Sequence, residues 1–390
     1  MSHANFYPLT NVVKNYPWGS HTALNTFFHV LNPDNQPQAE LWMGVHPAGS
    51  SSVIEKGTPL LLSDFIAQNK PAMLGATVSQ RFDNLPFLLK ILSAETALSI
   101  QVHPTKTQAE AGFLRQKQSG AADYNDENHK PELVYAITDF MAMNGFREIA
   151  DIINNFKLLA IPTLDCAVSS LQQCPNSEGL KRFFIALMQM SLTVKEQVLH
   201  LLVNASQRLY GEELSAFIQR LHKNYPNDIG ILAPLILNCI TLKPGEAMFL
   251  HPGTLHAYVQ GTAIEVMASS DNVLRAGLTG KNINLTELVH CTSFEPTRFE
   301  SLLMAPHWES EQASYPIPVD DFRFSIFNEV NNHPVSISSG EILLVISGNA
   351  LLRHCDGEVL TVQTGQSVFI PASAGSYSLT TSGRLCRVFC

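Results

Sequence analysis

Residues 242–258 read LKPGEAMFLHPGTLHAY, and residues 362–377 repeat this pattern as VQTGQSVFIPASAGSY with one gap. Each copy predicts a strand, a glycine turn, a second strand, a proline-containing turn and a third strand that reaches a tyrosine. An internal repeat indicates that one structural unit occurs more than once in a chain. We therefore expect two related β-domains. The copies differ at one position of chemical interest, since Gly375 replaces His256.

Short strand patterns also surround the two copies. They extend from residue 5 to about residue 103 and return after about residue 230, with Gly, Pro and Asn between them. Two short helices are expected within the first region, at residues 60–68 and 105–117. Many short antiparallel strands at this spacing are typical of a double-sheet jelly roll. The sequence therefore predicts a mainly β fold.

The region between the strand-rich parts has a helical periodicity. Apolar residues recur three and four positions apart within residues 180–188, 198–205 and 214–221, which is the pattern of amphipathic helices. TVKE at residues 193–196 is a capping-box pattern. We interpret this block of three or four helices as a packing module without chemistry of its own.

The patterns thus divide the chain into a strand-rich region, a helical block at residues 147–225 and further strands that continue to the C-terminus. The family resemblance given below implies that the helical block is an insertion in one β-domain. The expected units are then a first β-domain of residues 1–146 and 226–310, a helical insertion of residues 147–225 and a smaller C-terminal β-domain of residues 311–390.

The composition is that of an ordinary soluble globular protein, with 390 residues, 45% hydrophobic and 15% charged. A net charge of −9 without any Lys/Arg block argues against a nucleic-acid partner. The apolar run at residues 231–237 is far too short to span a bilayer. The first residues lack the basic and apolar regions of a signal peptide. Seven scattered cysteines without a C-x-x-C pair indicate reduced thiols. We expect a cytoplasmic protein with no membrane partner.

A strand at residues 97–106, ALSIQVHPTK, carries two polar side chains on one face. Gln101 and His103 are two positions apart, so they point to the same side of the strand. Glu132 follows in NHKPEL, and His256 lies in the first copy of the repeat. Imidazole nitrogens combined with a carboxylate and an amide oxygen suit Zn²⁺, Fe²⁺ or Mn²⁺.

The order of six motifs resembles that of the type I mannose-6-phosphate isomerase family, a branch of the cupin superfamily. The resemblance extends from the N-terminus to about residue 281 and departs from the common family pattern at Gly280, where proline usually precedes the lysine. The motifs are NYPWGS (15–20), LLKILSA (88–94), SIQVHP (99–104), HKPELV (129–134), HPGTLHAY (251–258) and SSDNVLRAGLTGK (269–281).

The resemblance implies both an architecture and a reaction. The family has a catalytic cupin domain with a helical insertion, followed by a smaller, metal-free cupin-like domain. Its reaction interconverts mannose 6-phosphate and fructose 6-phosphate through an enediol, so the implied partner is a small-molecule sugar phosphate. One Zn²⁺ per chain is implied, with Gln101, His103, Glu132 and His256 as ligands. A metal ion beside the reacting oxygens stabilises developing negative charge.

The resemblance also implies roles for residues outside the metal site. The family pattern marks Arg275 as catalytic, and a guanidinium group can bind a phosphate or an enediolate with two hydrogen bonds. No glycine-rich phosphate loop is present, so lysine side chains are expected to bind the phosphate. The candidate catalytic residues are Arg275, His129, Lys130 and Asp271. The candidate phosphate contacts are Lys130, Lys90 and Lys281.

Two other functions are compatible with a cupin metal site. An iron-dependent cupin oxygenase usually has three histidines and a glutamate, or two histidines and a carboxylate, and Gln101 argues against it. A metal-stabilised cupin that binds a sugar without turnover is the second alternative, and Arg275 and Lys130 beside the metal set argue against it. For the assembly we expect a monomer or a weak homo-oligomer.

Overall fold

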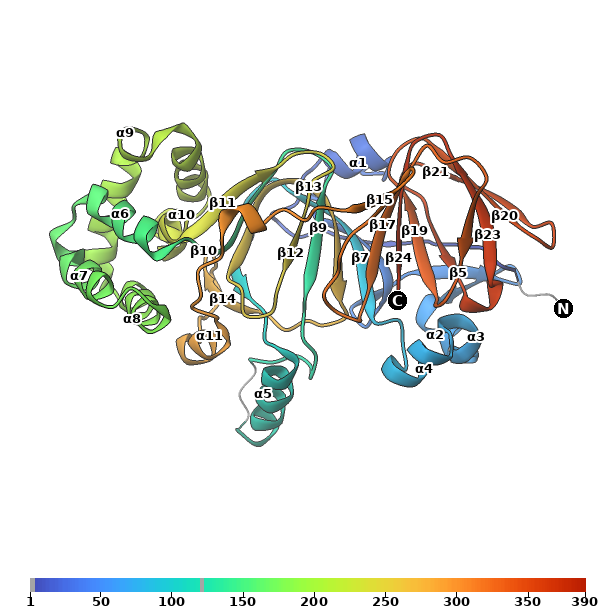
Figure 1. Ribbon diagram of the computed structural model, residues 1–390, viewed down its shortest axis with the longest axis horizontal. Coiled ribbons are helices and arrows are strands. Elements are labelled where there is room, and N and C mark those ends of the chain that lie inside the picture. Colours follow the sequence, from blue (N-terminus) through green and yellow to red (C-terminus); the bar gives the residue numbers. More distant parts are fainter. Residues whose placement is uncertain (1–3, 120–122) are drawn as a thin grey trace.

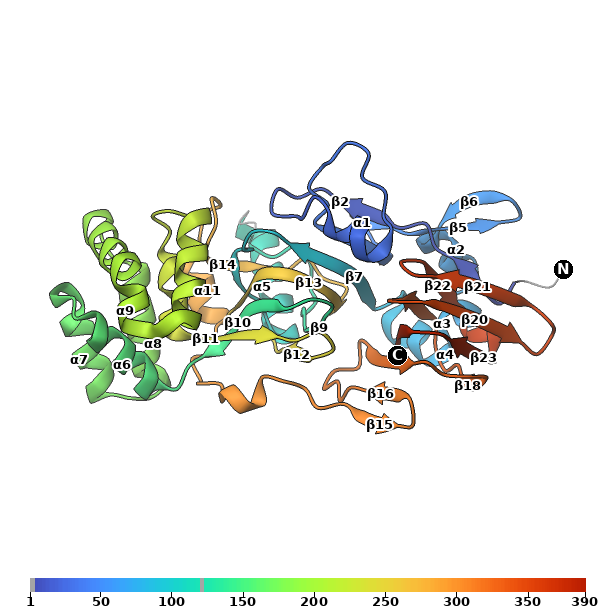
Figure 2. The ribbon, with the colours of Figure 1, turned by 90° about the horizontal axis from the view of Figure 1, so that it is seen from above.

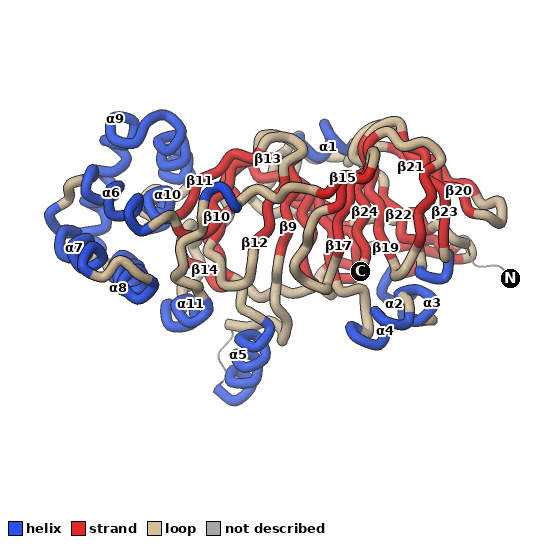
Figure 3. Tube along the Cα trace, viewed as in Figure 1, coloured by secondary structure: helices blue, strands red, loops and turns tan. Residues whose placement is uncertain are grey.

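The structure is a computed structural model that describes residues 4–119 and 123–390. Three parts lie in a row: a helical block at one end, a central β-domain, and a β-sandwich that contains the C-terminus (Figure 1). Strands form the central and C-terminal parts, whereas helices gather in the block and at the margins (Figure 3). The predicted mainly β fold with a helical insertion is confirmed. Within the described residues, no helix is long and apolar enough to cross a membrane.

The central β-domain is built on one eleven-stranded sheet. Its strands are β2 (Val12–Lys14), β3 (Glu40–His46), β4 (Gly49–Ser50), β7 (Phe87–Ala94), β8 (Ile100–Val102), β9 (Glu132–Ala136), β10 (Phe140–Phe146), β11 (Leu237–Leu242), β12 (Ala247–Leu250), β13 (His256–Ala268) and β14 (Leu274–Gly277). The main path runs β11-β10-β13-β7-β3-β2, and the other strands attach to it.

Strand β13 joins two parts of this sheet. Its first residues pair with β8 and β10, and from Gly261 onward it pairs with β7 and β9. Gly261 has a φ of 123°, and a Cβ atom there would lie 2.5 Å from the carbonyl oxygen of Asp139. Only glycine fits this crossing. The crossing places His256, the first residue of β13, beside β8.

Two sheets form the C-terminal sandwich. The larger sheet contains β1 (Tyr7–Pro8), β15 (His307–Glu309), β16 (Gln312–Ser314), β17 (Arg323–Asn328), β19 (Glu341–Val345), β22 (Ser367–Ile370) and β24 (Arg384–Phe389). The smaller sheet contains β18 (His333–Ser336), β20 (Asn349–His354), β21 (Val359–Gln363) and β23 (Ser376–Thr381). Apolar side chains from both sheets, such as Leu343 and Leu352, share one core. The second β-domain expected from the repeat is therefore present.

The two β-domains also share a hydrophobic core. It includes Phe65 and Phe249 from the central domain and Phe322 and Phe369 from the C-terminal sandwich. The N-terminal strand β1 strengthens this union, because it pairs with β22 of the sandwich. Since burial of apolar surface is the main favourable term in folding, the two domains stabilise each other.

The helical block contains α6 (Ile149–Leu159), η1 (Pro162–Leu164), α7 (Asp165–Gln173), α8 (Ser177–Met188) and α9 (Leu192–Asn224). The predicted apolar stripe of α8 is buried, including Leu180 and Phe184. Helix α9 is kinked at Gly211, whose φ is 76°. Turn η2 (Ile229–Leu232) and α10 (Ala233–Ile236) lead from α9 into β11. Strand β14 and α11 (Leu285–Cys291) lie beside this block (Figure 2).

Short elements complete the fold. Helices α2 (Leu62–Gln68) and α5 (Lys106–Ser119) confirm the two helices expected at residues 60–68 and 105–117. The sequence did not predict α1 (Ala23–Phe28), α3 (Lys70–Leu74) and α4 (Ala76–Phe82), which have at most two turns and show no apolar periodicity. The remaining elements are β5 (Ser52–Glu55), β6 (Thr58–Leu61), η3 (Phe299–Ser301) and η4 (Ala372–Ala374).

Candidate active site

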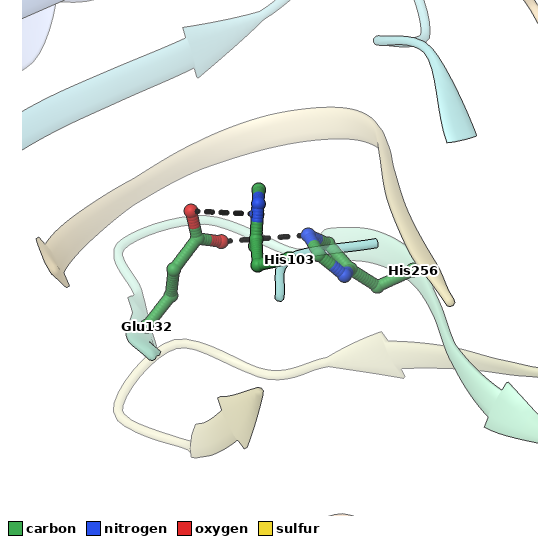
Figure 4. Close-up of side chains that lie close together, drawn as sticks. All are labelled: His103, Glu132 and His256. Carbon is green, nitrogen blue, oxygen red and sulfur yellow. Dashed lines mark ion pairs between the residues drawn. The ribbon is translucent and has the colours of Figure 1, made fainter. Parts of the chain in front are cut away.

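Three buried side chains converge in the central β-domain. His103 directly follows β8, Glu132 begins β9 and His256 begins β13. Each is at most 3% exposed, and one donor atom of each lies within 4.8 Å of the others. Figure 4 shows that the carboxylate of Glu132 faces both imidazole rings. Within residues 4–119 and 123–390, only this group of His, Cys, Asp and Glu side chains has the arrangement of a metal site.

The backbone orients both imidazole rings. Nδ1 of His103 lies 2.6 Å from the carbonyl oxygen of Asn272, and Nδ1 of His256 lies 2.9 Å from that of Thr254. A carbonyl only accepts, so each Nδ1 carries the proton and each Nε2 presents a lone pair. The Nε2 atoms lie 3.3 Å and 3.5 Å from the carboxylate oxygens of Glu132.

This orientation leaves an unsatisfied atom, because Nε2 of His103 is buried and has no hydrogen-bond partner. A lone pair that faces a carboxylate oxygen in a buried site is unfavourable unless a cation lies between them. A backbone carbonyl that fixes the ring through Nδ1 is the usual arrangement around a metal-binding histidine. The residues present therefore fit a divalent metal ion.

The neighbouring charges set the protonation states that a metal requires. Burial and the nearby Lys130 ammonium lower the pKa of His103 to about 4. Burial would raise the pKa of Glu132, but Lys130 and His103 hold it well below its usual range. Lys130 Nζ lies 2.8 Å from Oε1 of Glu132, and the Tyr258 hydroxyl donates to Oε2 at 2.8 Å. A neutral imidazole and an ionised carboxylate are the forms that bind metals.

Gln101 lies next to this group in the sheet. Its partner across the β8–β13 pair is His256, and its partner across the β8–β14 pair is Arg275. Gln101 thus lies between a metal-site histidine and the guanidinium residue expected to be catalytic. Its side-chain amide donates to Ser99 Oγ at 3.2 Å. Its role as a fourth ligand stays a prediction.

A cleft of about 760 Å³ lies next to the cluster. A separate hollow of about 60 Å³ is lined by Glu132 and His256, and Gln101 and Lys130 line both spaces. The volume of the cleft is typical of small-molecule sites. Side chains in the wider cleft that bear on ligand binding are Tyr16, Trp18, Trp42, Lys90, Tyr225, Asp271, Arg275 and Lys281.

The floor of the cleft holds a buried charge network that the sequence reasoning missed. Lys90 Nζ lies 2.8 Å from Oε2 of Glu265 and 3.5 Å from Oε1 of Glu40, and Glu40 also accepts from the indole of Trp42 at 2.7 Å. Burial opposes the charged form of Lys90, but the two carboxylates raise its pKa above its usual value. A charged residue within an otherwise apolar strand, as in IEVMA, is the signal that could have identified Glu265.

Arg275 is half-buried and lines the cleft. Burial lowers the pKa of its guanidinium group, and no carboxylate of the described chain offsets this effect. Lys281 also lines the cleft and is exposed. The cleft thus contains a guanidinium group that no carboxylate of residues 4–119 and 123–390 balances, and such a group is suited to an anionic ligand.

The two candidates for proton transfer lie in different surroundings. Asp271 lines the cleft, and its Oδ1 lies 3.3 Å from Nε2 of His46. His46 lowers the pKa of Asp271. His129 does not line the cleft in the described part of the chain, and its Nε2 lies 2.9 Å from Oδ2 of Asp321, just before β17.

Family models match three parts of the chain. Residues 6–149 match the catalytic domain of type I phosphomannose isomerase, residues 161–237 match the helical insertion domain of the same family, and residues 311–390 match the cupin domain of mannose-6-phosphate isomerase. Together these models cover most of the sequence.

Relatives with a curated name match over nearly the full length. The mannose-6-phosphate isomerase of Salmonella typhimurium is 44% identical over 389 residues, covering 98% of each chain. Its counterpart in Escherichia coli is 43% identical over 390 residues with the same coverage. The mannose-6-phosphate isomerase of Homo sapiens is 34% identical over 412 residues, covering 96% of this chain and 95% of the human one.

Solved structures of mannose-6-phosphate isomerases are also similar to the structure of this chain. A zinc-bound mannose 6-phosphate isomerase is similar with a TM-score of 0.94 and 43% identity, covering 99% of both chains. A variant of the phosphomannose isomerase of Salmonella typhimurium is similar with a TM-score of 0.95 at the same identity and coverage.

Proposed function

Because this chain belongs to the type I phosphomannose isomerase family, we propose that it is a zinc-dependent mannose-6-phosphate isomerase. It interconverts mannose 6-phosphate and fructose 6-phosphate. The single observation that carries the metal dependence is the unsatisfied Nε2 of His103, which points at Glu132 in the His103–Glu132–His256 group.

One Zn²⁺ per chain is held by His103, Glu132, His256 and, as the fourth ligand, Gln101. When bound, zinc supplies a positive charge that stabilises negative charge on the substrate oxygens. The amide of Gln101 adds no charge, so the ligand set contributes only the single negative charge of Glu132. Lys130 holds that carboxylate in its ionised form through the 2.8 Å contact.

The substrate's negative charges meet the cationic side chains of the cleft. Arg275 stabilises the enediolate, because no carboxylate of the described residues offsets the burial of its guanidinium group. The exposed Lys281 binds the phosphate. Lys130 and Lys90 stay candidates for phosphate contacts, although each already has a carboxylate partner within 2.8 Å.

The reaction moves a proton from C2 of the open-chain aldose to C1. Asp271 and Lys130 both line the cleft. Lys130 is paired with Glu132 at 2.8 Å and His129 with Asp321 at 2.9 Å, whereas the contact of Asp271 with His46 is longer, at 3.3 Å. We therefore favour Asp271 over Lys130 and His129 for proton handling.

An isomerase assay with mannose 6-phosphate tests the function. Activity should disappear on chelation and return when zinc is added, with one zinc per chain in the purified protein. Absence of turnover by the zinc-loaded protein contradicts the isomerase assignment, while stoichiometric iron without zinc favours the oxygenase alternative.

Solvent deuterium tests the proton route. A base that is exposed to water exchanges its proton, so turnover in D₂O should place deuterium on carbon in the product. Absence of label, together with full transfer of a C2 deuterium to C1, would indicate hydride transfer instead.

Three further expectations remain proposals. The domain division stays at residues 1–146 with 226–310, 147–225 and 311–390; the long helices between Ile149 and Asn224 support it. A monomer or weak homo-oligomer is proposed for the assembly. A cytoplasmic location is supported by the seven cysteines, none of which is paired.

A further inference from the structure

The loop that follows β14 has an unusual backbone conformation. Leu278 has a φ of 52°, in the left-handed region, and its side chain is 1% exposed. A leucine rarely adopts this region, and the conformation persists only where surrounding contacts hold it. The same loop continues through Thr279 to Lys281, and all three residues line the cleft.

One carboxylate makes three hydrogen bonds that hold this loop. Oδ1 of Asp228 accepts hydrogen bonds from the backbone N–H groups of Leu278 and Gly230, each at 2.7 Å. Oδ2 accepts from the N–H of Thr279 at 3.3 Å. Asp228 therefore connects two backbone segments that are far apart in the sequence.

The two segments also approach each other closely at their glycines. A Cβ atom added to Gly277 would lie 3.0 Å from Oδ1 of Asp228, and one added to Gly230 would lie 2.8 Å from Cγ of Leu278. Larger residues would separate the segments, so the glycines permit the short hydrogen bonds of Asp228.

Asp228 lies between α9 and η2, just beyond the proposed insertion of residues 147–225 but within residues 161–237, which match the helical insertion domain of the family. Tyr225 of the same segment lines the cleft, and its hydroxyl donates to the carbonyl oxygen of Ala97 at 2.8 Å. The insertion therefore contacts the cleft at two points. This contrasts with the expectation that it is a packing module only.

Arg275 and Lys281 depend on different supports. Arg275 lies within β14, where Leu274 pairs with Val102 and Arg275 pairs with Gln101. Lys281 lies beyond the end of β14, and the hydrogen bonds of Asp228 fix the loop directly before it. Loss of the Asp228 carboxylate should therefore displace Lys281 and leave Arg275 in its strand.

We propose that Asp228 is a positioning residue that holds Lys281 against the phosphate of the substrate, so that the helical insertion takes part in substrate binding. This inference rests on the proposed function, in which Lys281 binds the phosphate.

The first test is steady-state kinetics of Asp228→Ala with mannose 6-phosphate. KM should rise at least about tenfold while kcat stays within about threefold, because a binding group is displaced and the groups that act on the enediolate are not. Zinc content should stay at one per chain, since the ligands lie on other elements. Asp228→Asn keeps an acceptor oxygen for Leu278 and Gly230, so its KM should fall between those of wild type and Asp228→Ala.

A matched control separates positioning from general stability. Asn176 also caps a helix of the insertion, because its side chain accepts from the N–H of Gly179 at 3.0 Å, and it does not line the cleft. Asn176→Ala should lower the melting temperature without changing KM. If Asp228→Ala behaves like this control, Asp228 is only a structural cap and the inference is wrong.

A double variant tests whether Asp228 acts through Lys281. Lys281→Ala should raise KM, and adding Asp228→Ala to it should cause no further rise, because the positioned group is already absent. A normal KM in Lys281→Ala, or effects that multiply in the double variant, overturns the inference. Failure of the proposed function is distinguishable, since the wild-type protein itself would then not isomerise mannose 6-phosphate.

Discussion

The two repeated β-domains keep one buried carboxylate at the same position. Glu132 pairs with Leu250 across β9 and β12, and Glu341 pairs with Ile370 across β19 and β22. Leu250 and Ile370 are equivalent in the sequence repeat, in which FLHP corresponds to FIP. The two glutamates are therefore equivalent by strand register, although their flanking sequences do not align.

The tyrosine that supports the carboxylate is also repeated. Tyr258 donates to Glu132 at 2.8 Å, and Tyr377 donates to Glu341 at 2.7 Å. Both hydroxyls are buried. A buried carboxylate with a tyrosine donor is thus common to both domains, and the difference between them lies in the cations.

The cation in the C-terminal domain is a permanent part of the chain. Nε and Nη2 of Arg387, on β24, lie 2.8 Å and 2.6 Å from Oε2 of Glu341. In the central domain two imidazole lone pairs face Glu132, and at the position of His256 the second domain has Gly375. Arg387 therefore balances Glu341 with a cation of the chain, whereas Glu132 has both the Lys130 ammonium, 2.8 Å from its Oε1, and the proposed metal ion.

A buried carboxylate requires a cation in both domains, and chemistry requires in addition that this cation faces a cleft. Glu341 is 0% exposed and its partner Arg387 is 7% exposed. Glu132, by contrast, lines the hollow that shares Gln101 and Lys130 with the cleft. The C-terminal pair is suited to stability, and the central group is suited to catalysis.

The largest effect on activity should follow loss of the proposed zinc ion. His103→Ala and His256→Ala should each remove zinc and lower kcat/KM by a factor on the order of 10³ or more, because the positive charge beside the substrate oxygens is lost. The variants should stay folded, since the shared core is unchanged. Metal analysis and circular dichroism check this. Full zinc occupancy in both variants would contradict the assignment.

Loss of the Arg387 guanidinium group should lower the free energy of unfolding and leave the catalytic activity unchanged. Arg387→Met leaves the carboxylate of Glu341 buried without a cation, with only the Tyr377 hydrogen bond remaining, and this should destabilise the protein by about 3–5 kcal/mol. Zinc content and kcat of the folded fraction should be unchanged. Urea unfolding measures the loss.

A double variant provides the control for this prediction. Combining Arg387→Met with Glu341→Gln removes both charges and should restore most of the stability. If the double variant is as unstable as Arg387→Met, the packing of the Arg387 side chain matters more than its charge, and the comparison between the two cations fails.

Unlike the buried Arg387, Arg275 lines the cleft. Arg275→Ala should lower kcat by a factor on the order of 10² with zinc retained, because this guanidinium group stabilises charge that develops during the reaction. Steady-state kinetics measure kcat and KM, and metal analysis measures the zinc content. A change confined to KM would make Arg275 a binder of the phosphate, and wild-type kinetics would exclude it from the reaction.

Some of these structural features could be predicted from the sequence, and others could not. The repeat and the alternation of Gln101 and His103 are local patterns, so they predicted the two β-domains and a polar strand face. The pairing of Glu341 with Arg387 is not local, because 46 positions separate them and β19 meets β24 only in the folded sheet. Asp228 likewise acts on residues about 50 positions away, and no periodic pattern marks such a residue.

The smallest effects should come from the two equivalent tyrosines. Their substitution compares the same hydrogen bond in the two β-domains directly. Tyr258→Phe and Tyr377→Phe each remove one hydrogen bond to a buried carboxylate and leave the ring in place. A hydrogen bond to a charged group contributes about 1.5–3 kcal/mol. In Tyr377→Phe this loss should lower the free energy of unfolding without changing zinc affinity or kcat.

In Tyr258→Phe the loss of the hydrogen bond should also lower the affinity for zinc. Glu132 would be held less firmly, and residues that orient metal ligands typically contribute about 10- to 100-fold in metal affinity or activity. Competition with a zinc chelator, measured for both variants beside wild type, distinguishes the outcomes. Equal zinc affinity in Tyr258→Phe and Tyr377→Phe would mean that the tyrosine serves only packing in both domains, and that the central carboxylate does not depend on it to bind a metal. A weaker zinc site in Tyr258→Phe alone would show that the same hydrogen bond supports stability in one domain and metal binding in the other.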